Sequence, residues 1–417
     1  MSGIDLTHPA PHREWWQENG VVHRYVSDLL ADELARLRRG NGPLPPLPWR
    51  DSLAIDRDLG ADSLELMQLG TALAEAIHLH EAGIEDGLLA RRSLADWVGI
   101  AQTGLAHYSS ELTFRTSGSS GMPKACVHAL ATLHQETERL ATLFTGRRRI
   151  LSAVPSHHIY GFLFTVLLPQ MIGIRADAVI DLRRSSPARL ASCLQPGDLV
   201  IGHPEFWQAV GRTVPHAPAD VFGVTSTAPC ADHISEAVER TGIAKLFHIY
   251  GSSETAGVGW RSSYREPYRL FSYWSFDAQA ESKLVRSLPD GATRIVSSPD
   301  ALERCGQETF LVGARQDGAV QVGGINVFPR HVADILKHHP KIREAAVRLM
   351  RPEEGSRLKA YVVLTPDILD PAAFLSELRD WIDSVLSAPE RPKSITFGAA
   401  LPRTASGKLC DWQPSVD

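Results

Sequence analysis

The sequence predicts an α/β fold in which a large domain with parallel sheets is preceded by a helical segment and followed by a small α+β lid domain. Three patterns support this. Apolar residues recur at helical spacing near the N-terminus, and short apolar runs alternate with helical segments in the middle of the chain. The C-terminal part is patterned as helix, strand, strand, helix, strand. Continuously apolar strands separated by helices are typical of a parallel sheet covered on both faces.

The N-terminal part is expected to be helical over residues 1–105. Val22 to Leu37 has a helical apolar period. A second helix is expected to begin at Asp58-Leu59-Gly60-Ala61-Asp62-Ser63-Leu64-Glu65 and to run to about Leu79. Asp62 and Glu65 have the spacing of a capping box, with Asp62 as the N-cap.

The middle of the chain, residues 106–316, is expected to form the large domain. Its predicted strands are Ile150–Val154, Leu199–Ile201, Val221–Thr225 and Leu246–Tyr250, and its predicted helices include Pro187–Leu194, Pro204–Val210 and Asp232–Arg240. Right-handed crossovers place the loops after such strands at one edge of the sheet, where ligands bind. Residues 317–417 are expected to form the small domain.

Composition excludes several classes of protein. A chain of 417 residues with 43% hydrophobic content can bury more than one core. Its formal charge of -5 argues against a nucleic-acid partner, and the densest basic run, Arg147-Arg148-Arg149, is expected to be a solvated turn. We find neither an apolar stretch of membrane-spanning length nor a signal-peptide pattern, so a cytoplasmic protein without a membrane partner is expected.

Metal ligation by cysteine or histidine is not predicted. The five cysteines show no Cys-x-x-Cys spacing. The histidine pairs His157-His158 and His338-His339 are adjacent, so the two members of a pair cannot share one helix face as the ligands of His-Glu-x-x-His do.

A stretch of small residues begins at Thr116 and reads Thr116, Ser117, Gly118, Ser119, Ser120, Gly121, Met122, Pro123 and Lys124. Hydroxyl and glycine residues let backbone N–H groups approach a polyphosphate, and the lysine adds a mobile cation. Lys124 follows Met122-Pro123 without a hydroxyl after it, so this is not the P-loop of nucleoside triphosphatases. From these residues alone, a flexible loop is an equally good interpretation.

Further segments carry groups that suit a nucleotide. Tyr250 at a strand end offers a flat ring to a purine, and Glu254 is a natural Mg²⁺ ligand. Asp300, in Ser298-Pro299-Asp300, has a carboxylate that fits two ribose hydroxyls, although a simple turn is equally consistent with it. His158, in the segment Pro155 to Gly161, would by itself be read as core packing.

These segments, together with Leu401-Pro402-Arg403-Thr404-Ala405-Ser406-Gly407-Lys408, resemble in order the motifs of the adenylate-forming enzymes, the superfamily of acyl-CoA synthetases, peptide adenylation domains and luciferases. The resemblance spans residues 112–408. It implies an ATP-dependent acid–thiol ligase that uses Mg²⁺, forms acyl-AMP and pyrophosphate, and passes the acyl group to a thiol.

The resemblance also implies a role for each matching residue. Lys408 would stabilise the transition state, Glu254 would hold the metal, and Asp317 would be the hinge between the two domains. His158, Tyr160 and Gly251 would line the substrate pocket, with His158 as its gate. The implied nucleotide-binding residues are Thr116, Ser117, Gly118, Ser119, Ser120, Gly121, Lys124, Thr227, Ala228, Tyr250, Gly251, Ser252, Ser253, Asp300 and Arg315.

The N-terminal segment resembles an acyl carrier protein, with Ser63 at the position of the phosphopantetheine serine. The Ser/Gly loop also comes unusually early for the superfamily. Such short forms resemble the hydroxybenzoate ligases of aryl-polyene pathways, which implies an aromatic acid substrate and an acyl carrier protein as the probable partner.

Three alternatives stay open from the sequence. The acceptor of the acyl group is free CoA, or it is a phosphopantetheine arm on Ser63 itself. Alternatively, the chain is a non-catalytic scaffold that retains the nucleotide fold.

Overall fold

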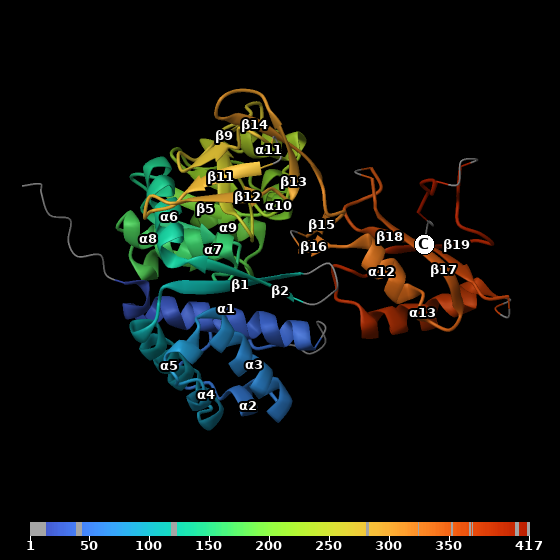
Figure 1. Cartoon of the computed structure of the whole chain (residues 1–417), viewed down its shortest axis with the longest axis horizontal. Coiled ribbons are helices and arrows are strands. Elements are labelled where there is room, and N and C mark those ends of the chain that lie inside the picture. The colour runs from blue at the N-terminus through green and yellow to red at the C-terminus, as the bar shows by residue number, and fades with distance from the viewer. Residues whose placement is uncertain are drawn as a thin grey trace, which may run out of the picture.

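The computed structural model describes residues 14–38, 44–117, 123–280 and 283–414, apart from 324, 352, 367, 369 and 405–407. Helices at the N-terminus lie beneath the hairpin β1–β2, the large sheet lies above that hairpin, and the small C-terminal domain lies to one side (Figure 1). The predicted fold class, with a large α/β part, a small C-terminal domain and an N-terminal helical segment, is confirmed.

The N-terminal helices form one layer. They are a 3₁₀ turn at Trp15–Gln17 and helices α1 (Asn19–Leu37), α2 (Ile55–Asp58), α3 (Ser63–Ala76), α4 (Asp86–Ala90) and α5 (Leu94–His107), with a second 3₁₀ turn at Leu79–Glu81. The capping box of α3 is present, since Asp62 accepts from the amide of Glu65 and the Glu65 side chain accepts from the amide of Asp62.

This helical layer shares its apolar core with the rest of the large domain. Trp15 packs edge-on against Phe162 with ring centroids 5.3 Å apart, and it also contacts Tyr25 of α1. Buried residues from α1 to α5 belong to the same cluster as Leu112 and Phe114 of β1 (Glu111–Ser117). The N-terminal segment is therefore packed as part of the large domain.

A nine-stranded sheet organises the large domain, in the order β13-β14-β9-β8-β7-β6-β5-β3-β4. Its strands are β3 (Arg149–Ser152), β4 (Val179–Asp181), β5 (Asp198–Gly202), β6 (Phe222–Thr225), β7 (Lys245–Ser252), β8 (Ala256–Arg261), β9 (Tyr268–Leu270), β13 (Asp300–Arg304) and β14 (Thr309–Arg315). Strands β4, β3, β5, β6 and β7 are parallel, whereas β8, β9, β14 and β13 continue the sheet antiparallel.

Both faces of the parallel strands are covered. On β3, Ile150 belongs to the main core and its neighbour Leu151 to a second apolar cluster around Trp207. Helices α6 (Leu130–Leu143), α7 (Ile159–Phe162) and α8 (Leu168–Met171), with a π turn at Leu163–Leu167 between the last two, contribute to the first face. Helices α9 (Pro187–Cys193), α10 (Pro204–Thr213) and α11 (Asp232–Arg240) cover the second. The alternation of side chains along a strand separates the two cores.

Two smaller sheets complete the large domain. Strands β1 and β2 (Pro123–Ala129) form an antiparallel hairpin, and β10 (Trp274–Phe276), β11 (Lys283–Ser287) and β12 (Thr293–Ser297) form a three-stranded antiparallel sheet.

The small domain has its own core. It contains β15 (Val320–Val322), β16 (Ile325–Val327), α12 (Pro329–Leu336), β17 (Ile342–Leu349), β18 (Leu358–Leu364), α13 (Pro371–Val385) and β19 (Ser394–Phe397). Val332, Val362 and Leu378 lie in an apolar cluster that belongs to this domain.

Two further expectations from the sequence concern the basic run and membrane-spanning helices. The solvated turn at Arg147-Arg148-Arg149 is a wrong prediction for Arg147, whose side chain is 7% exposed because it pairs with Asp220 at 2.7 Å and stacks on Phe222. Among the described residues, no helix combines the length and the apolar character needed to cross a bilayer.

Candidate active site

The Ser/Gly stretch sits at the tip of the β1–β2 hairpin. Thr116 pairs with Lys124 and Ser117 with Pro123 across the hairpin. The predicted phosphate-binding residues Gly118, Ser119, Ser120 and Gly121 lie outside the described residues. The hairpin positions Lys124 so that its Nζ donates to Glu254 Oε1 at 2.8 Å.

Lys124 and Glu254 come from elements 130 residues apart in the chain. The hydrogen bond to Glu254 raises the pKa of Lys124. Burial tends to raise the pKa of Glu254, but the hydrogen bond from Lys124 and local backbone hydrogen bonding lower it overall. Both groups are therefore charged at neutral pH, and both remain partly exposed, with side-chain exposures of 57% and 36%.

A tight turn between β7 and β8 projects Glu254. Within it, the amide of Ser252 donates to Thr255 Oγ1 at 3.0 Å and the amide of Thr255 donates to Ser252 Oγ at 3.2 Å. The imidazole of His128 lies 2.6 Å from the carbonyl oxygen of Ser253. Gly251 is needed because a Cβ there would lie 2.2 Å from the carbonyl oxygen of Ala256. These contacts fix the conformation of the turn that carries Glu254.

Tyr250, at the end of β7, meets Asp300. Its hydroxyl donates to Asp300 Oδ2 at 2.9 Å and also lies 2.9 Å from Ser298 Oγ. Arg315 stands opposite Asp300 in the β13–β14 pair. Burial raises the pKa of Asp300 although the hydrogen bond from Tyr250 opposes this rise. Three of the predicted nucleotide-binding residues therefore lie close together: Asp300 of β13 contacts Tyr250 of β7 and pairs across the strands with Arg315 of β14.

The loop after β6 carries backbone strain. Thr227 has φ of 77°, which is rare for a β-branched residue. Ser226 holds the loop by donating to the carbonyl of Ile249 at 3.0 Å. Ala228 follows in the same loop, beside the end of β7. Strain of this kind collects at ligand sites, so the loop is consistent with the predicted nucleotide-binding role of Thr227 and Ala228.

A histidine loop, residues 155–158, follows β3 and leads into α7. Gly161 allows α7 to approach this loop, because a Cβ at Gly161 would lie 1.8 Å from the carbonyl oxygen of Pro155. Tyr160 is buried and its hydroxyl donates to the carbonyls of Gly202 and Val224, both at 3.1 Å, so it ties α7 to the ends of β5 and β6.

His158 caps the N-terminus of α7. Its imidazole has a solvent-exposed edge, while the protein around it withholds much of the hydration that a charged ring needs. This desolvation, aided by neighbouring His157, lowers the pKa of His158 to about 4. The ring is therefore neutral at physiological pH.

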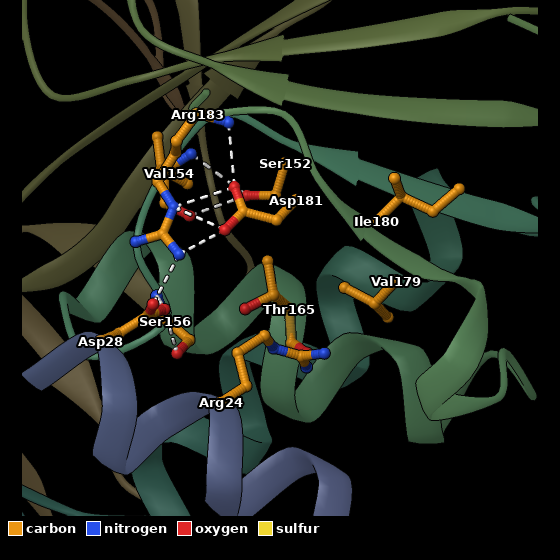
Figure 2. Close-up of a pocket in the computed structure, with 10 residues that line it drawn as sticks. All are labelled: Arg24, Asp28, Ser152, Val154, Ser156, Thr165, Val179, Ile180, Asp181 and Arg183. Atoms are coloured by element: carbon orange, nitrogen blue, oxygen red, sulfur yellow. Dashed lines mark hydrogen bonds and ion pairs between the residues drawn. The ribbon is translucent and has the colours of Figure 1, made fainter. Parts of the chain in front are cut away.

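Helix α1 fixes the histidine loop through buried charge. Asp28 accepts hydrogen bonds from the amide and hydroxyl of Ser156 at 2.8 and 2.7 Å, and it pairs with Arg183 at 2.5 Å. Figure 2 shows Arg183 between Asp181 and Asp28, with Arg24 of α1 below. Arg24 donates to the carbonyl of Thr165 at 2.6 Å. Sequence reasoning missed this role of Asp28 and Arg183 because the contacts of Asp28 with Ser156 and Arg183 join residues more than 100 positions apart in the chain.

Asp317 and Lys408 complete the set of predicted residues. Asp317 pairs with Arg315 at 2.5 Å, just before β15, at the entry to the small domain. Lys408 lies beside a short bridge between Arg403 and Leu409. Its carbonyl accepts from the amide of Thr404 at 2.8 Å, and its amide donates to Thr404 Oγ1 at 3.1 Å. In this conformation the small domain lies to one side of the large domain (Figure 1). Lys408 is therefore not joined by any described contact to Lys124 or Glu254.

The residues that are brought together fit a magnesium–nucleotide complex. Glu254 supplies an ionised carboxylate oxygen, the ligand type that Mg²⁺ prefers. Lys124 supplies a cation for phosphate, and Asp300 supplies acceptors for hydroxyl groups. Because Lys124 and Glu254 are paired with each other, their ion pair must open for these ligands to bind.

Comparison with known proteins is consistent with this geometry. Residues 113–298 match the AMP-binding enzyme family and residues 331–408 match the AMP-binding enzyme C-terminal domain. The sequence is 39% identical to 4-coumarate–CoA ligase of Cereibacter sphaeroides, over 91% of this chain and 89% of that protein. The chain belongs to the AMP-binding enzyme family. The prediction of an ATP-dependent, AMP-forming acid–thiol ligase is thereby confirmed.

Two further similarities extend over most of this enzyme. 4-Coumarate–CoA ligase of Halorhodospira halophila is 36% identical over 93% of this chain and 98% of that protein. The amide bond synthetase from Marinactinospora thermotolerans shares the fold, with a TM-score of 0.60 and 18% identity over 93% of this chain and 92% of the other. The first relatives therefore include the N-terminal helices as well as the two matched domains.

Proposed function

We propose that this enzyme is an aryl-CoA ligase that activates 4-coumarate, or a closely related hydroxycinnamate, as its acyl-AMP and then forms the CoA thioester. The proximity of Lys124, Glu254, Tyr250 and Asp300 at the end of β7 supports the nucleotide half of this proposal. The names of two relatives that are similar over more than 90% of this chain support the acid. Hydroxybenzoates, which the early position of the Ser/Gly loop in the chain suggested, are the next candidate substrates.

In the first step a carboxylate oxygen of the acid attacks the α-phosphorus of ATP, and the bond to the β-phosphate breaks. Lys124 binds the departing phosphates after it separates from Glu254. Glu254 holds Mg²⁺, which neutralises phosphate charge when bound. Tyr250 flanks the adenine, and Asp300 accepts hydrogen bonds from the ribose hydroxyls. These groups position the triphosphate for in-line displacement.

Lys408 supplies the remaining positive charge. Negative charge grows on the phosphorus oxygens as pyrophosphate leaves, so a cation aimed there stabilises the transition state. Because Lys408 has no described contact with the nucleotide residues here, the small domain must rotate to deliver it. Asp317, next to the Arg315 pair, is the proposed hinge.

In the second step the CoA thiolate attacks the acyl carbon and AMP leaves. Free CoA is favoured over a tethered carrier because the N-terminal helices share a core with the large domain. A carrier segment fixed in that way cannot swing as a separate body. A separate acyl carrier protein stays a possible acceptor to be tested beside CoA.

The decisive test measures acid-dependent exchange of pyrophosphate into ATP over 4-coumarate, cinnamate, 4-hydroxybenzoate, 3-hydroxybenzoate and a fatty acid. Mass spectrometry then asks whether the acid that exchanges best ends on CoA or on a carrier protein. We expect 4-coumarate to exchange fastest and to appear as its CoA thioester. Exchange that does not depend on any acid contradicts the proposal. No exchange with any of these acids also contradicts it, and favours a non-catalytic scaffold.

A second candidate acceptor is Ser63 itself. Ser63 is exposed at the start of α3, and beside it Leu64 and Met67 are 63% and 54% exposed. An exposed serine beside exposed apolar side chains is accessible to a modifying enzyme. Treatment with a phosphopantetheinyl transferase and CoA would then add one phosphopantetheine to the parent but not to Ser63→Ala. No mass increase in the parent, under conditions that modify a control carrier, removes this candidate.

A further inference from the structure

We propose that Asp32, His157 and His158 form a binding site for a divalent ion of the zinc class, separate from the proposed magnesium site at Glu254. One ligand atom from each of these three residues lies within 4.8 Å of the others. His157 Nε2 is 3.4 Å from Asp32 Oδ2, and the two imidazole rings have centroids 4.3 Å apart. Helix α1 provides the carboxylate and the histidine loop provides both rings.

The expectation from the sequence was that the two members of an adjacent histidine pair cannot share one helix face as metal ligands. That expectation considered one helix face only. Here His157 lies in a turn and His158 in extended backbone, both before α7, so they are not on a helix face. The third ligand comes from α1, more than 100 residues earlier in the chain.

The surroundings of the His157 side chain suit a residue that binds a metal ion. Its side chain is only 9% exposed, yet neither ring nitrogen has a hydrogen-bond partner. Asp32 Oδ2, 3.4 Å from His157 Nε2, is within ion-pair distance of a protonated ring. A buried polar group without a partner costs about 1–3 kcal/mol. A metal ion bound to a ring nitrogen would satisfy it.

The ligand set selects the class of ion. Two imidazoles and one carboxylate suit zinc and its first-row neighbours, whereas magnesium prefers oxygen ligands and water. Ligand atoms around a tetrahedral zinc lie about 3.3 Å apart, given bonds of about 2.0–2.1 Å. The Asp32–His157 separation already matches this spacing, and the exposed side chains of Asp32 and His158 need only small rotations to close the rest.

Such a site would connect metal binding to substrate binding. His158 is the residue proposed to gate the acid pocket, so an ion on its imidazole would compete with the acid. This consequence rests on the proposed function, whereas the binding of the ion does not. We therefore expect zinc to inhibit turnover in competition with the acid, while magnesium at Glu254 is still required.

The test uses the full-length protein and the metal alone. Zn²⁺ affinity is measured by competition with a chromogenic chelator, and Co²⁺ is used as a spectroscopic probe of nitrogen ligation. Asp32→Asn and His157→Ala are the test variants. His338→Ala is the matched control, because His338 is exposed and also belongs to an adjacent histidine pair.

We expect the parent and His338→Ala to bind one equivalent of Zn²⁺ with equal affinity, and each test variant to lose at least about tenfold. The visible Co²⁺ bands should weaken with the same variants. A parent that binds no more Zn²⁺ than His157→Ala overturns the proposal, and so does Asp32→Asn binding as tightly as the parent. If His157→Ala does not fold, the nearly isosteric Asp32→Asn still decides. None of these measurements uses an acid or ATP, so they are independent of the proposed reaction.

Discussion

The N-terminal helices and the C-terminal small domain are both attached to the same large sheet, but in different ways. The helices share one apolar core with the sheet, from Trp15 to Phe310, and α1 also reaches the histidine loop through Asp28. The small domain has a separate core, and among the described residues no apolar cluster spans it and the large domain. The N-terminal helices are therefore a fixed part of the large domain, whereas the small domain can rotate without disrupting an apolar core.

The largest effect on activity is expected in the small domain, which we expect to rotate. Lys408→Ala should reduce acid-dependent pyrophosphate exchange by about 10²–10³-fold, because it removes a cation from the transition state. The melting temperature should not change, since Lys408 is exposed. The exchange assay and a thermal melt check the two halves of this prediction.

Lys393→Ala is the control, because Lys393 is an exposed lysine of the same domain. It should exchange pyrophosphate like the parent. Equal losses in the two lysine variants would mean that general charge, rather than delivery of one residue, links the small domain to the chemistry.

Two matched leucines test the difference between the attachments directly. Leu30 in α1 and Leu378 in α13 are both fully buried. Either change to alanine should cost about 2–5 kcal/mol. We expect Leu30→Ala to increase hydrogen exchange in α1 and also in β3, β5 and β7, because they share a core. Leu378→Ala should increase it in β17, β18 and α12 only.

Hydrogen exchange followed by mass spectrometry resolves these elements. If Leu30→Ala loosens only the helices before residue 108, the N-terminal part is an independent unit and the carrier-like interpretation gains support. If Leu378→Ala loosens the large sheet, the two cores are coupled and free rotation of the small domain is contradicted.

The sequence predicted most elements of both regions, because helix and strand periodicity is a local property. The strands at Ile150, Leu199 and Leu246 and the capping box at Asp62 are found where they were expected. The site motifs were also local, so Lys124, Tyr250 and Glu254 were identifiable before their contacts were known. Asp300 was a weak candidate because its motif is degraded, and its contact with Tyr250 depends on strand pairing.

What the sequence did not reveal depends on long-range packing. Arg147 looks solvated in its basic run, but the chain at Asp220 covers it. Asp28, Asp32 and Arg183 belong to no motif. Asp28 and Asp32 meet Arg183 and His157 only because α1 packs here, whereas Arg183 also pairs with its near neighbour Asp181. His128 of β2 likewise gains its contact with Ser253 only when the β1–β2 hairpin lies beside the turn after β7. No local sequence pattern encodes contacts between residues so far apart in the chain.

A buried carboxyl group gives a pH-dependent test of the large domain. Burial raises the pKa of Glu136 from its ordinary value of 4.5 to about 7, opposed in part by Arg286 and the amide of Gly257. The folded state therefore holds this proton more tightly than the unfolded chain, and its stability falls as the pH rises from 4.5 to about 7. Glu136→Gln should remove this loss and gain up to about 3 kcal/mol relative to the parent across that window.

Denaturant unfolding at several pH values measures this difference. Glu138→Gln is the control, because Glu138 is exposed on the same helix and should follow the parent. The gain should appear in the unfolding of the large domain and not in that of the small domain. A constant difference between Glu136→Gln and the parent at all pH values would show that Glu136 is already ionised in the folded state.

The smallest effect concerns the capping box beside Ser63. Asp62→Ala removes the acceptor for the Glu65 amide, which should cost about 1 kcal/mol. Asp62→Asn keeps a side-chain oxygen at the cap and should cost much less, while activity should be unchanged in both. Because α3 shares the core of the large domain, the loss in Asp62→Ala should lower the melting of that whole domain. If instead only α3 frays, as amide exchange would reveal, this helix can detach locally, and access of a modifying enzyme to Ser63 becomes easier to accept.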